Sequence, residues 1–428
     1  MSFENRMTTN SRTMAVCSDG QNQLTIPGSL RSVVSHETAS RSHCAFGDHL
    51  RAVVLTGSLA RGEETVELEA DFKRVLGDAE FLLIFHEGVV LPNSTAIQAL
   101  QEEIEQAVKR HQIRCKVGLG AVHPAYLQRL PKHVFSYELR NNGRVVWGDL
   151  AILSQIPAFR SQDILREDAW QMLCNRSIEL LENPADFGRE SIDRAGPLHY
   201  RTVKLYLDMA TSLLIFARAY APSYRERERN LRHLASESTD PSQWPFDLRS
   251  FAQQVSACTA RKLSEARAQG DPLPISWENA VRCAGQLWRW ELEQLTRLGE
   301  QNSISDREML FRLVRLQSPA KRLRGWIYVL RKCGWHRSWR NWPRWMRLAW
   351  RASPRYWVYA ASNELLARLP ALLSVASGLA EVDSGVRELW GCLPVVRRSQ
   401  SRGTAEEWQA IATEISWNYH EFLEHTRA

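Results

Sequence analysis

The chain has 428 residues, of which 44% are hydrophobic and 24% charged, and its formal net charge is +7. This is an ordinary globular composition, and the length exceeds that of one typical core, so we expect two or three domains. The eight cysteines show no Cys-x-x-Cys pair and no metal-ligand spacing with histidine. That distribution disfavours a disulfide framework or a zinc site and favours reduced thiols in a cytoplasmic protein.

The N-terminal residues 1 to 45 are rich in Ser, Thr, Asn and Arg and lack the charged-then-apolar layout of a signal peptide. They are predicted to be a disordered leader. The most apolar helical stretch, Leu205 to Ala221, carries Asp208 and Arg218 and falls short of the ~20 apolar residues that a bilayer span needs. We predict no transmembrane helix and a cytoplasmic location, with peripheral contact to the inner face of the membrane as an alternative.

Residues 48 to 150 are predicted to form a small α/β domain. Ala52 to Thr56 and Glu80 to Phe85 are short runs of β-branched or aromatic residues next to glycine, a pattern typical of strands. From Ser94 to His111 the apolar positions recur at helical spacing, and Ser94 is a suitable N-cap.

Two further strands are expected after this helix, at Cys115 to Val122 and Val134 to Leu139. The second is predicted to turn at Asn141-Asn142-Gly143 into a last strand, Arg144 to Trp147. The sequence therefore predicts a β-α-β unit with a hairpin at its end.

The chain after Gly148 is predicted to be helical, as one domain over residues 160 to 235 and a second region over 275 to 428. The intervening segment, Ala235 to Pro274, contains enough Ser, Asp, Pro and Gly for a linker or long loop.

Three helices are expected in this region. One spans Asp163 to Leu181, and another spans Leu198 to Ala221, between Pro197 and Pro222. The last opens at Thr404 with the capping box Thr404-x-x-Glu407.

The stretch "TGSLARGE" suggests a phosphate-binding turn. Gly57 allows close approach of the backbone, N–H groups at a helix start point toward an anion, and the Ser58 hydroxyl can add a hydrogen bond. Arg61 adds positive charge within one turn. Taken alone, such a stretch is more often only a turn.

The stretch "GDAEFLLIF" contains two carboxylates on one predicted strand. Asp78 and Glu80 stand at i and i+2, so both point to the face opposite Phe81 and Leu83. Two adjacent carboxylates repel unless a cation lies between them, and oxygen ligands suit Mg²⁺. The structural alternative is a pair of solvated acids at a strand edge.

Together these two stretches resemble the nucleotidyltransferase domain of the DNA polymerase beta superfamily, especially its small bacterial, aminoglycoside-nucleotidyltransferase-like members. The resemblance covers about a quarter of the chain. It implies that Gly57, Ser58 and Arg61 bind the triphosphate, and that Asp78 and Glu80 hold Mg²⁺ as catalytic metal ligands.

The family pattern also has a third carboxylate on a later strand, and here the sequence departs from it. "CKVGLGAV", Cys115 to Val122, contains no acid. Glu138 is the best substitute as third catalytic and metal-binding residue, with Asp149 behind it. Without a third carboxylate the domain would bind nucleotide and not turn it over.

Four other residues are secondary candidates. Arg201 and Lys204 stand at i and i+3 on one predicted helix and could contact phosphates, although a surface ion pair of Lys204 with Asp208 is the favoured interpretation. His86 and His123 are candidate bases, although single histidines usually have structural roles.

A basic, tryptophan-rich segment spans residues 321 to 357. It holds eleven Lys or Arg, no Asp or Glu, and seven of the sixteen tryptophans. Pro343 and Pro354 are expected to interrupt any helix there. Three interpretations stay open: tryptophans buried in a helical core, contact with an anionic membrane surface or lipid-linked substrate, and, less favoured, nucleic acid.

The charged stretch "RERERNLRHL", Arg225 to Leu234, resembles the Arg-Asn-x-x-x-His signature of HEPN ribonucleases, but His233 follows Arg229-Asn230 one residue too early. A charged, solvated helix end is the expected structure.

The predicted fold class is an α/β (α+β) nucleotidyltransferase-like N-terminal domain followed by a mostly α-helical C-terminal region. The predicted function is Mg²⁺-dependent transfer of a nucleotidyl group from a nucleoside triphosphate such as ATP to a hydroxyl acceptor. The alternative is a catalytically degenerate domain that acts as an interaction or peripheral membrane protein.

Overall fold

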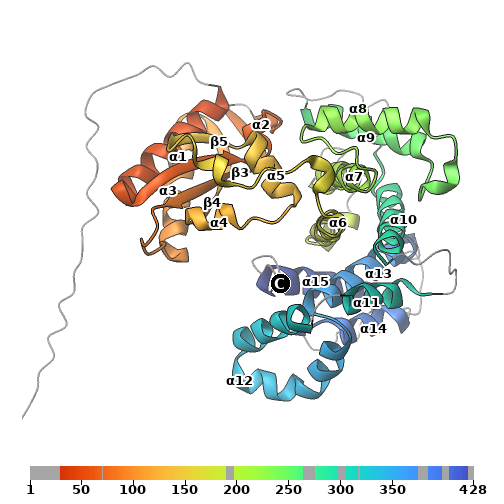
Figure 1. The fold of residues 1–428 in the computed structure, drawn as a ribbon. Helices are drawn as coiled ribbons and strands as arrows, with labels where there is room; N and C mark the ends of the chain where they lie inside the picture. Colours follow the sequence, from red (N-terminus) through yellow and green to blue (C-terminus); the bar gives the residue numbers. More distant parts are fainter. Residues whose placement is uncertain are drawn as a thin grey trace, which may run out of the picture. The chain divides into compact units, whose positions relative to one another are not determined.

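The computed structural model describes residues 29–69, 71–188, 197–263, 275–296, 304–316, 319–374, 384–397 and 404–422. Two compact units are present (Figure 1). The first comprises Met1–Gly62, Glu69–Leu127 and Gly143–Gln155, and the second comprises Glu63–Leu68, Gln128–Asn142 and Ile156–Ala428. The predicted succession of a mixed α/β region and a mostly helical region is confirmed.

The α/β unit is built on a mixed sheet. Strand β1 pairs antiparallel with β3 and with β5, and β4 pairs parallel with β3. The helix α3 connects β3 to β4, which confirms the predicted β-α-β unit. The elements are α1 (Leu30–Phe46), β1 (Leu50–Thr56), α2 (Gly57–Arg61), β3 (Phe72–Phe85), α3 (Ser94–Arg110), β4 (Ile113–Val122), α4 (Pro124–Gln128) and β5 (Arg144–Gly148).

One face of this sheet is covered by α1 and α3 (Figure 1). Val34 from α1 and Ile104 from α3 are fully buried against alternate residues of β1 and β3, such as Val53 and Leu83. This alternation follows from the period of two in a strand. The strands themselves were predicted from their runs of β-branched or aromatic residues next to glycine. The N-cap of α3 is Asn93, which accepts from the N–H of Ala96, and not Ser94 as predicted.

The helix α1 corrects the predicted leader. Residues 30 to 45 were predicted to be disordered but belong to this helix, which ends at Phe46 and has Ser29 as N-cap accepting from the N–H of Ser32. Residues 1 to 28 lie outside the described part of the chain. A serine before a run with Val33 and Val34 was a helix-start signal that the polar composition masked.

The second correction concerns Val134 to Leu139, which forms the helix α5 (Val134–Asn142) and not a strand. The predicted hairpin into Arg144 to Trp147 is therefore wrong, although the strand itself is present as β5. The carboxylate of Asp168 accepts from the N–H of Val134 at the helix start. A cap supplied from 34 residues away leaves no local signal.

The helical unit has one continuous core. A single cluster of buried side chains extends from Ile164 to Phe422, so 160–235 and 275–428 are not separate domains. Most of the strand β2 (Thr65–Glu69) also belongs to this unit, which includes Glu63–Leu68. Its helices besides α5 are α6 (Arg166–Leu180), α7 (Pro197–Phe216), α8 (Tyr224–Glu237), α9 (Leu248–Leu263), α10 (Trp277–Thr296), α11 (Asp306–Arg315), α12 (Pro319–Arg351), α13 (Pro354–Ser374), α14 (Ser384–Cys392) and α15 (Thr404–Phe422).

Several predicted boundaries shift in this unit. The predicted helix from Leu198 ends at Phe216, because Arg218 adopts a positive φ of 58°. Sixteen residues of the predicted linker from Ala235 to Pro274 form α9, while residues 264 to 274 lie outside the described part. The helix predicted from Thr404 is present as α15, but the side chain of Thr404 lies outside the described part, so its capping box with Glu407 stays a prediction.

The helix α12 bends at Gly334, where φ is 72° and ψ is 162° (Figure 1). Pro343 lies inside the helical segment after this bend, contrary to the expectation that it would interrupt the helix. Pro354 is the first residue of α13, where a missing N–H costs nothing. No helix of the described residues is both long enough and apolar enough to cross a membrane.

Candidate functional site

The turn between β1 and α2 brings a carboxylate against a glycine. Strand β1 ends at Thr56, which lies opposite Glu80 in the antiparallel pairing with β3. Gly57 follows with φ of 71°, and a Cβ placed on it would lie 2.9 Å from Oε2 of Glu80. The positive φ favours glycine here, and the absence of a side chain lets the Glu80 carboxylate approach the turn. The "TGS" and "DAE" stretches, which are separate in sequence, are therefore neighbours in space.

The two acids of β3 lie on one face of the strand, as predicted. Asp78 and Glu80 are exposed, while Ala79 and Phe81 point into the core beneath α1 and α3. Exposed carboxylates at i and i+2 on a strand can both turn toward one cation. Their oxygen atoms are the donor type that Mg²⁺ prefers.

The neighbouring strand β4 supplies no acid at this level. Its parallel register with β3 places Lys116 beside Asp78 and Gly118 beside Glu80. Adjacent strands lie about 4.8 Å apart, so Lys116 contributes a positive charge next to the two carboxylates. Among the described residues no group of three His, Cys, Asp or Glu side chains could hold a metal ion.

Two arginines that the sequence analysis did not single out lie at the same turn. Gly62 ends α2 with φ of 73°, and a side chain there would collide with the guanidinium of Arg31. Nε of Arg31 is buried and donates to no partner among the described residues. From β5, Arg144 donates its Nε to the carbonyl of Ala60 at 2.7 Å. With Arg61, the last residue of α2, these side chains make the turn electropositive.

Arg31 was missed because it fell in the predicted leader. Arg144 belongs to no recognisable sequence motif. Only its position opposite Leu55 in the β1–β5 pairing shows that it lies near the turn. The Ser29 cap was the one local signal for Arg31.

Glu138, the predicted third carboxylate, belongs to the helical unit and has partners there. Its Oε1 accepts from Nη2 of Arg227 at 2.6 Å and from the hydroxyl of Tyr220 at 2.5 Å. Arg227 is 4% exposed and also donates to the carbonyls of Ala221 and Pro222. These are the contacts of a structural ion pair, and a metal-binding role for Glu138 stays a prediction.

The reserve carboxylate, Asp149, is held by other contacts. It accepts from Arg51 at 2.9 Å and from the N–H of Ala151. The N–H of Ala151, followed by the Arg51 guanidinium, holds the pKa of Asp149 below its usual value. Asp149 is therefore charged but already engaged.

Glu63, the last residue of "TGSLARGE", is buried and caps the start of α8. Its Oε1 accepts from the Ser223 hydroxyl at 2.8 Å and from the N–H of Tyr224 at 2.9 Å. The stretch Arg225 to Leu234 in this helix was expected to be a charged, solvated helix end. Arg227 within this stretch is instead buried and donates hydrogen bonds to Glu138, Ala221 and Pro222, which corrects that prediction.

The secondary candidates have structural surroundings. Arg201 pairs with Asp186 at 2.5 Å, and Asp208, the expected partner of Lys204, pairs with Arg176 instead. Lys204 lies 5.5 Å from the ring of Tyr200.

The candidate bases lie away from the carboxylates. His86 follows Glu80 by six residues along β3, a distance of roughly 20 Å at strand spacing. His123 follows the end of β4, beyond the residue that pairs with Ile84. Neither histidine can act as a base at Glu80 without a large movement of the sheet.

The tryptophans of residues 321 to 357 divide into two groups. Trp326, Trp345 and Trp357 are at most 7% exposed, and their indole N–H groups donate to backbone carbonyls. For these three the core interpretation is confirmed. Trp342 and Trp350 are 48% and 86% exposed. The side chains of Trp335 and Trp339 lie outside the described part.

Comparison of the chain with family models, with curated proteins and with solved structures finds no match. Function is therefore inferred from the geometry of the two units.

Proposed function

We propose that the α/β unit is a Mg²⁺-dependent nucleotidyltransferase, which moves a nucleotidyl group from a nucleoside triphosphate to a hydroxyl acceptor. The observation that carries this proposal is the contact of Glu80 with Gly57. The Glu80 carboxylate, which together with Asp78 is suited to Mg²⁺, lies against the turn whose N–H groups and Ser58 hydroxyl are suited to phosphates. This arrangement agrees with the resemblance of "TGSLARGE" and "GDAEFLLIF" to the DNA polymerase beta superfamily.

Each side chain has a role in this proposal. Asp78 and Glu80 hold the metal, and the Gly57-Ser58 backbone holds the triphosphate. Arg31, Arg61 and Arg144 offset the charge of the phosphates. The acceptor hydroxyl gives up its proton to solvent as its oxygen forms a bond to the α-phosphorus, the bond from that phosphorus to the bridging oxygen breaks, and pyrophosphate leaves with that oxygen. Bound Mg²⁺ supplies neutralisation of the phosphoryl charge and activation of the hydroxyl.

A second candidate is a nucleotidyltransferase-like domain without turnover, in a protein that acts through binding. The observation in its favour is the register of β4, where Lys116 and Gly118 stand beside Asp78 and Glu80. Glu138 is engaged by Arg227, so the described residues offer no clear general base. Such a protein would bind Mg²⁺ and nucleotide but release no pyrophosphate.

The test is pyrophosphate release from labelled nucleoside triphosphates with Mg²⁺ and a panel of hydroxyl acceptors. Asp78→Asn removes a metal ligand and is expected to lower the rate at least about 1000-fold, because a metal supplies several kcal/mol of transition-state stabilisation. Asp71→Asn is the matched control, since Asp71 is an exposed acid just before the same strand. Equal rates of pyrophosphate release by the two variants would contradict the proposal that Asp78 is a catalytic metal ligand. Nucleotide binding without turnover in wild type would support the second candidate.

A further inference from the structure

Exposed apolar side chains concentrate on α12. Among the described residues, five of its large apolar side chains are about half exposed or more: Leu323, Ile327, Trp342, Met346 and Trp350. Trp342, Met346 and Trp350 stand at i, i+4 and i+8, so they form one stripe along the helix after the bend. A stripe with two exposed indoles is unusual on a protein surface and indicates a binding face.

Arginines border this stripe on one side. At about 100° per residue around a helix, the stripe is followed by Arg347 and Arg351, then Arg344, and then the buried Trp345 and Leu348. None of these three arginines has an ion-pair partner in the described part of the chain, whereas Arg289 of α10 pairs with Asp306 and Arg307 of α11 pairs with Glu364.

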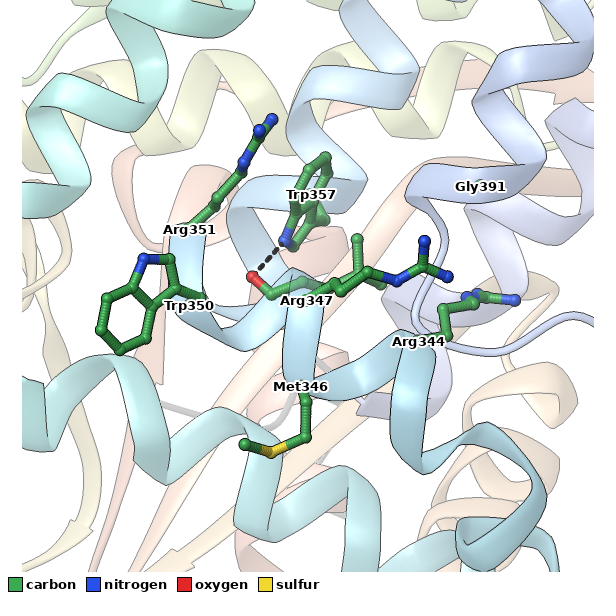
Figure 2. A pocket seen from close by; sticks show the side chains of 8 residues that line it. Arg344, Met346, Arg347, Trp350, Arg351, Trp357 and Gly391 are labelled. Atoms are coloured by element: carbon green, nitrogen blue, oxygen red, sulfur yellow. Dashed lines mark hydrogen bonds between the residues drawn. The ribbon is translucent and has the colours of Figure 1, made fainter.

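A cavity of 720 Å³ opens beside these arginines, lined by Arg344, Met346, Arg347, Leu348, Trp350, Arg351, Trp357 and Gly391. Figure 2 shows Arg344 and Arg347 extending toward Gly391 and Trp350 extending the other way. Nε and Nη2 of Arg344 are buried and lack a partner among the described residues. Burial lowers the pKa of Arg344, Cys392 opposes that shift and Arg347 adds to it. A buried cation of this kind is stabilised when an anion binds.

We propose that this face of α12 binds an anionic phospholipid membrane surface, with Trp342, Met346 and Trp350 at the headgroup level. Arg347 and Arg351 contact lipid phosphates at the edge of the stripe, and Arg344 takes one headgroup into the cavity. The layout of a buried face, a basic border and an exposed apolar stripe is that of a helix lying in a membrane interface. The segment's complete lack of acidic residues gives the charge complementarity.

A lipid surface fits this face better than nucleic acid does. Bases stack on the planes of aromatic rings, and Met346 separates the two exposed indoles of the stripe. Leu323 and Ile327 on the first half of α12 add aliphatic surface, which favours acyl chains and offers bases no stacking plane.

The test is flotation of the full-length protein with vesicles of phosphatidylcholine alone or mixed with phosphatidylglycerol. Wild type is expected to bind the mixed vesicles and not the neutral ones. Arg347→Gln with Arg351→Gln is expected to weaken binding about 30-fold, the equivalent of about 2 kcal/mol for two arginines at an anionic surface. Arg129→Gln with Arg225→Gln is the control for charge, because both residues are exposed in the same unit.

The stripe and the cavity are tested separately. Trp342→Ser, Met346→Ser and Trp350→Ser together should abolish binding, while Leu316→Ser, at an apolar residue that is 73% exposed, should leave it unchanged. Arg344→Gln should weaken lipid binding and leave the melting temperature unchanged. If Arg344 only stabilised the fold, the melting temperature would fall instead.

Three results would overturn the proposal. One is equal binding to neutral and anionic vesicles, and another is equal binding by the stripe variant and the Leu316 control. The third is tighter binding of soluble glycerol phosphate or single-stranded DNA than of vesicles, which would assign the arginines to a different anion.

Discussion

Asp78 in the α/β unit and Glu138 in the helical unit are both candidate metal ligands by sequence, but their surroundings differ. Asp78 is exposed on a strand, next to a second carboxylate and a glycine turn. Glu138 lies within reach of a buried arginine and a tyrosine hydroxyl. A carboxylate already used by an arginine stabilises the fold, whereas adjacent carboxylates exposed on one face are suited to a cation. The comparison separates a candidate site from a structural network.

The largest expected effect on stability comes from removing the hydrogen bonds of Glu138 to Arg227 and Tyr220. Glu138→Ala leaves Arg227 buried with less compensation, so the free energy of unfolding should fall by about 3 to 5 kcal/mol. Chemical denaturation monitored by circular dichroism measures this change.

The same variant also tests the catalytic prediction for Glu138. Below the unfolding transition, pyrophosphate release should stay at the wild-type level if Glu138 is structural. If Glu138→Ala kept its stability but lost turnover, Glu138 would be the third catalytic carboxylate and not part of a structural network.

A second prediction concerns Glu291 on α10, a helical-unit carboxylate that is fully buried, near Ser212. Burial raises its pKa from 4.5 to about 8. The folded state therefore keeps a proton that the unfolded state releases above pH 4.5. Its contribution to stability is fully present below that pH and is lost as the pH rises to about 8, at about 1.4 kcal/mol per pH unit.

Glu291→Gln removes this titration. Between pH 5 and pH 8 its melting temperature should fall less than that of wild type, and at pH 8 the variant should be the more stable protein. Glu278→Gln, at an exposed position of the same helix, should follow wild type at every pH. Parallel stability curves for Glu291→Gln and wild type would show that Glu291 is not held neutral.

The smallest expected effect concerns Arg31. Arg31→Gln removes one positive charge at the β1–α2 turn and should raise KM for the nucleoside triphosphate about tenfold, the equivalent of one hydrogen bond to a charged group. The value of kcat should change less. Steady-state kinetics of Arg31→Gln measure this change. Arg41→Gln is the control, because Arg41 is also on α1 but is paired with Glu37 and Glu103. A KM equal in both variants would remove Arg31 from the site.

The sequence predicted the elements whose hydrophobic period matched their burial. The helix α3 and the first half of β4 each bury one regular face, whereas β1 and the end of β3 are continuous apolar runs that are buried on both faces. In all four, local pattern and tertiary environment agree. The position of Asp78 and Glu80 on the exposed face of β3 followed from the same alternation.

Elements that depend on distant residues could not be predicted in this way. The helix α5 is capped by Asp168, and Glu63 caps α8 across 161 positions of sequence. The exposure of Trp350 beside the buried Trp357 depends on how α12 and α13 pack. Only the fold brings Arg31 and Arg144 to the turn at Gly57.

The central claim is that Mg²⁺ and a triphosphate bind together at Gly57, Asp78 and Glu80. Calorimetric titration of a non-hydrolysable nucleoside triphosphate analogue, with Mg²⁺ and with a chelator, tests it most directly. Wild type should bind the analogue tightly only with Mg²⁺, and Asp78→Asn with Glu80→Gln should lose that dependence while Asp71→Asn keeps it. Equal affinity with and without Mg²⁺ in all three proteins would contradict the claim.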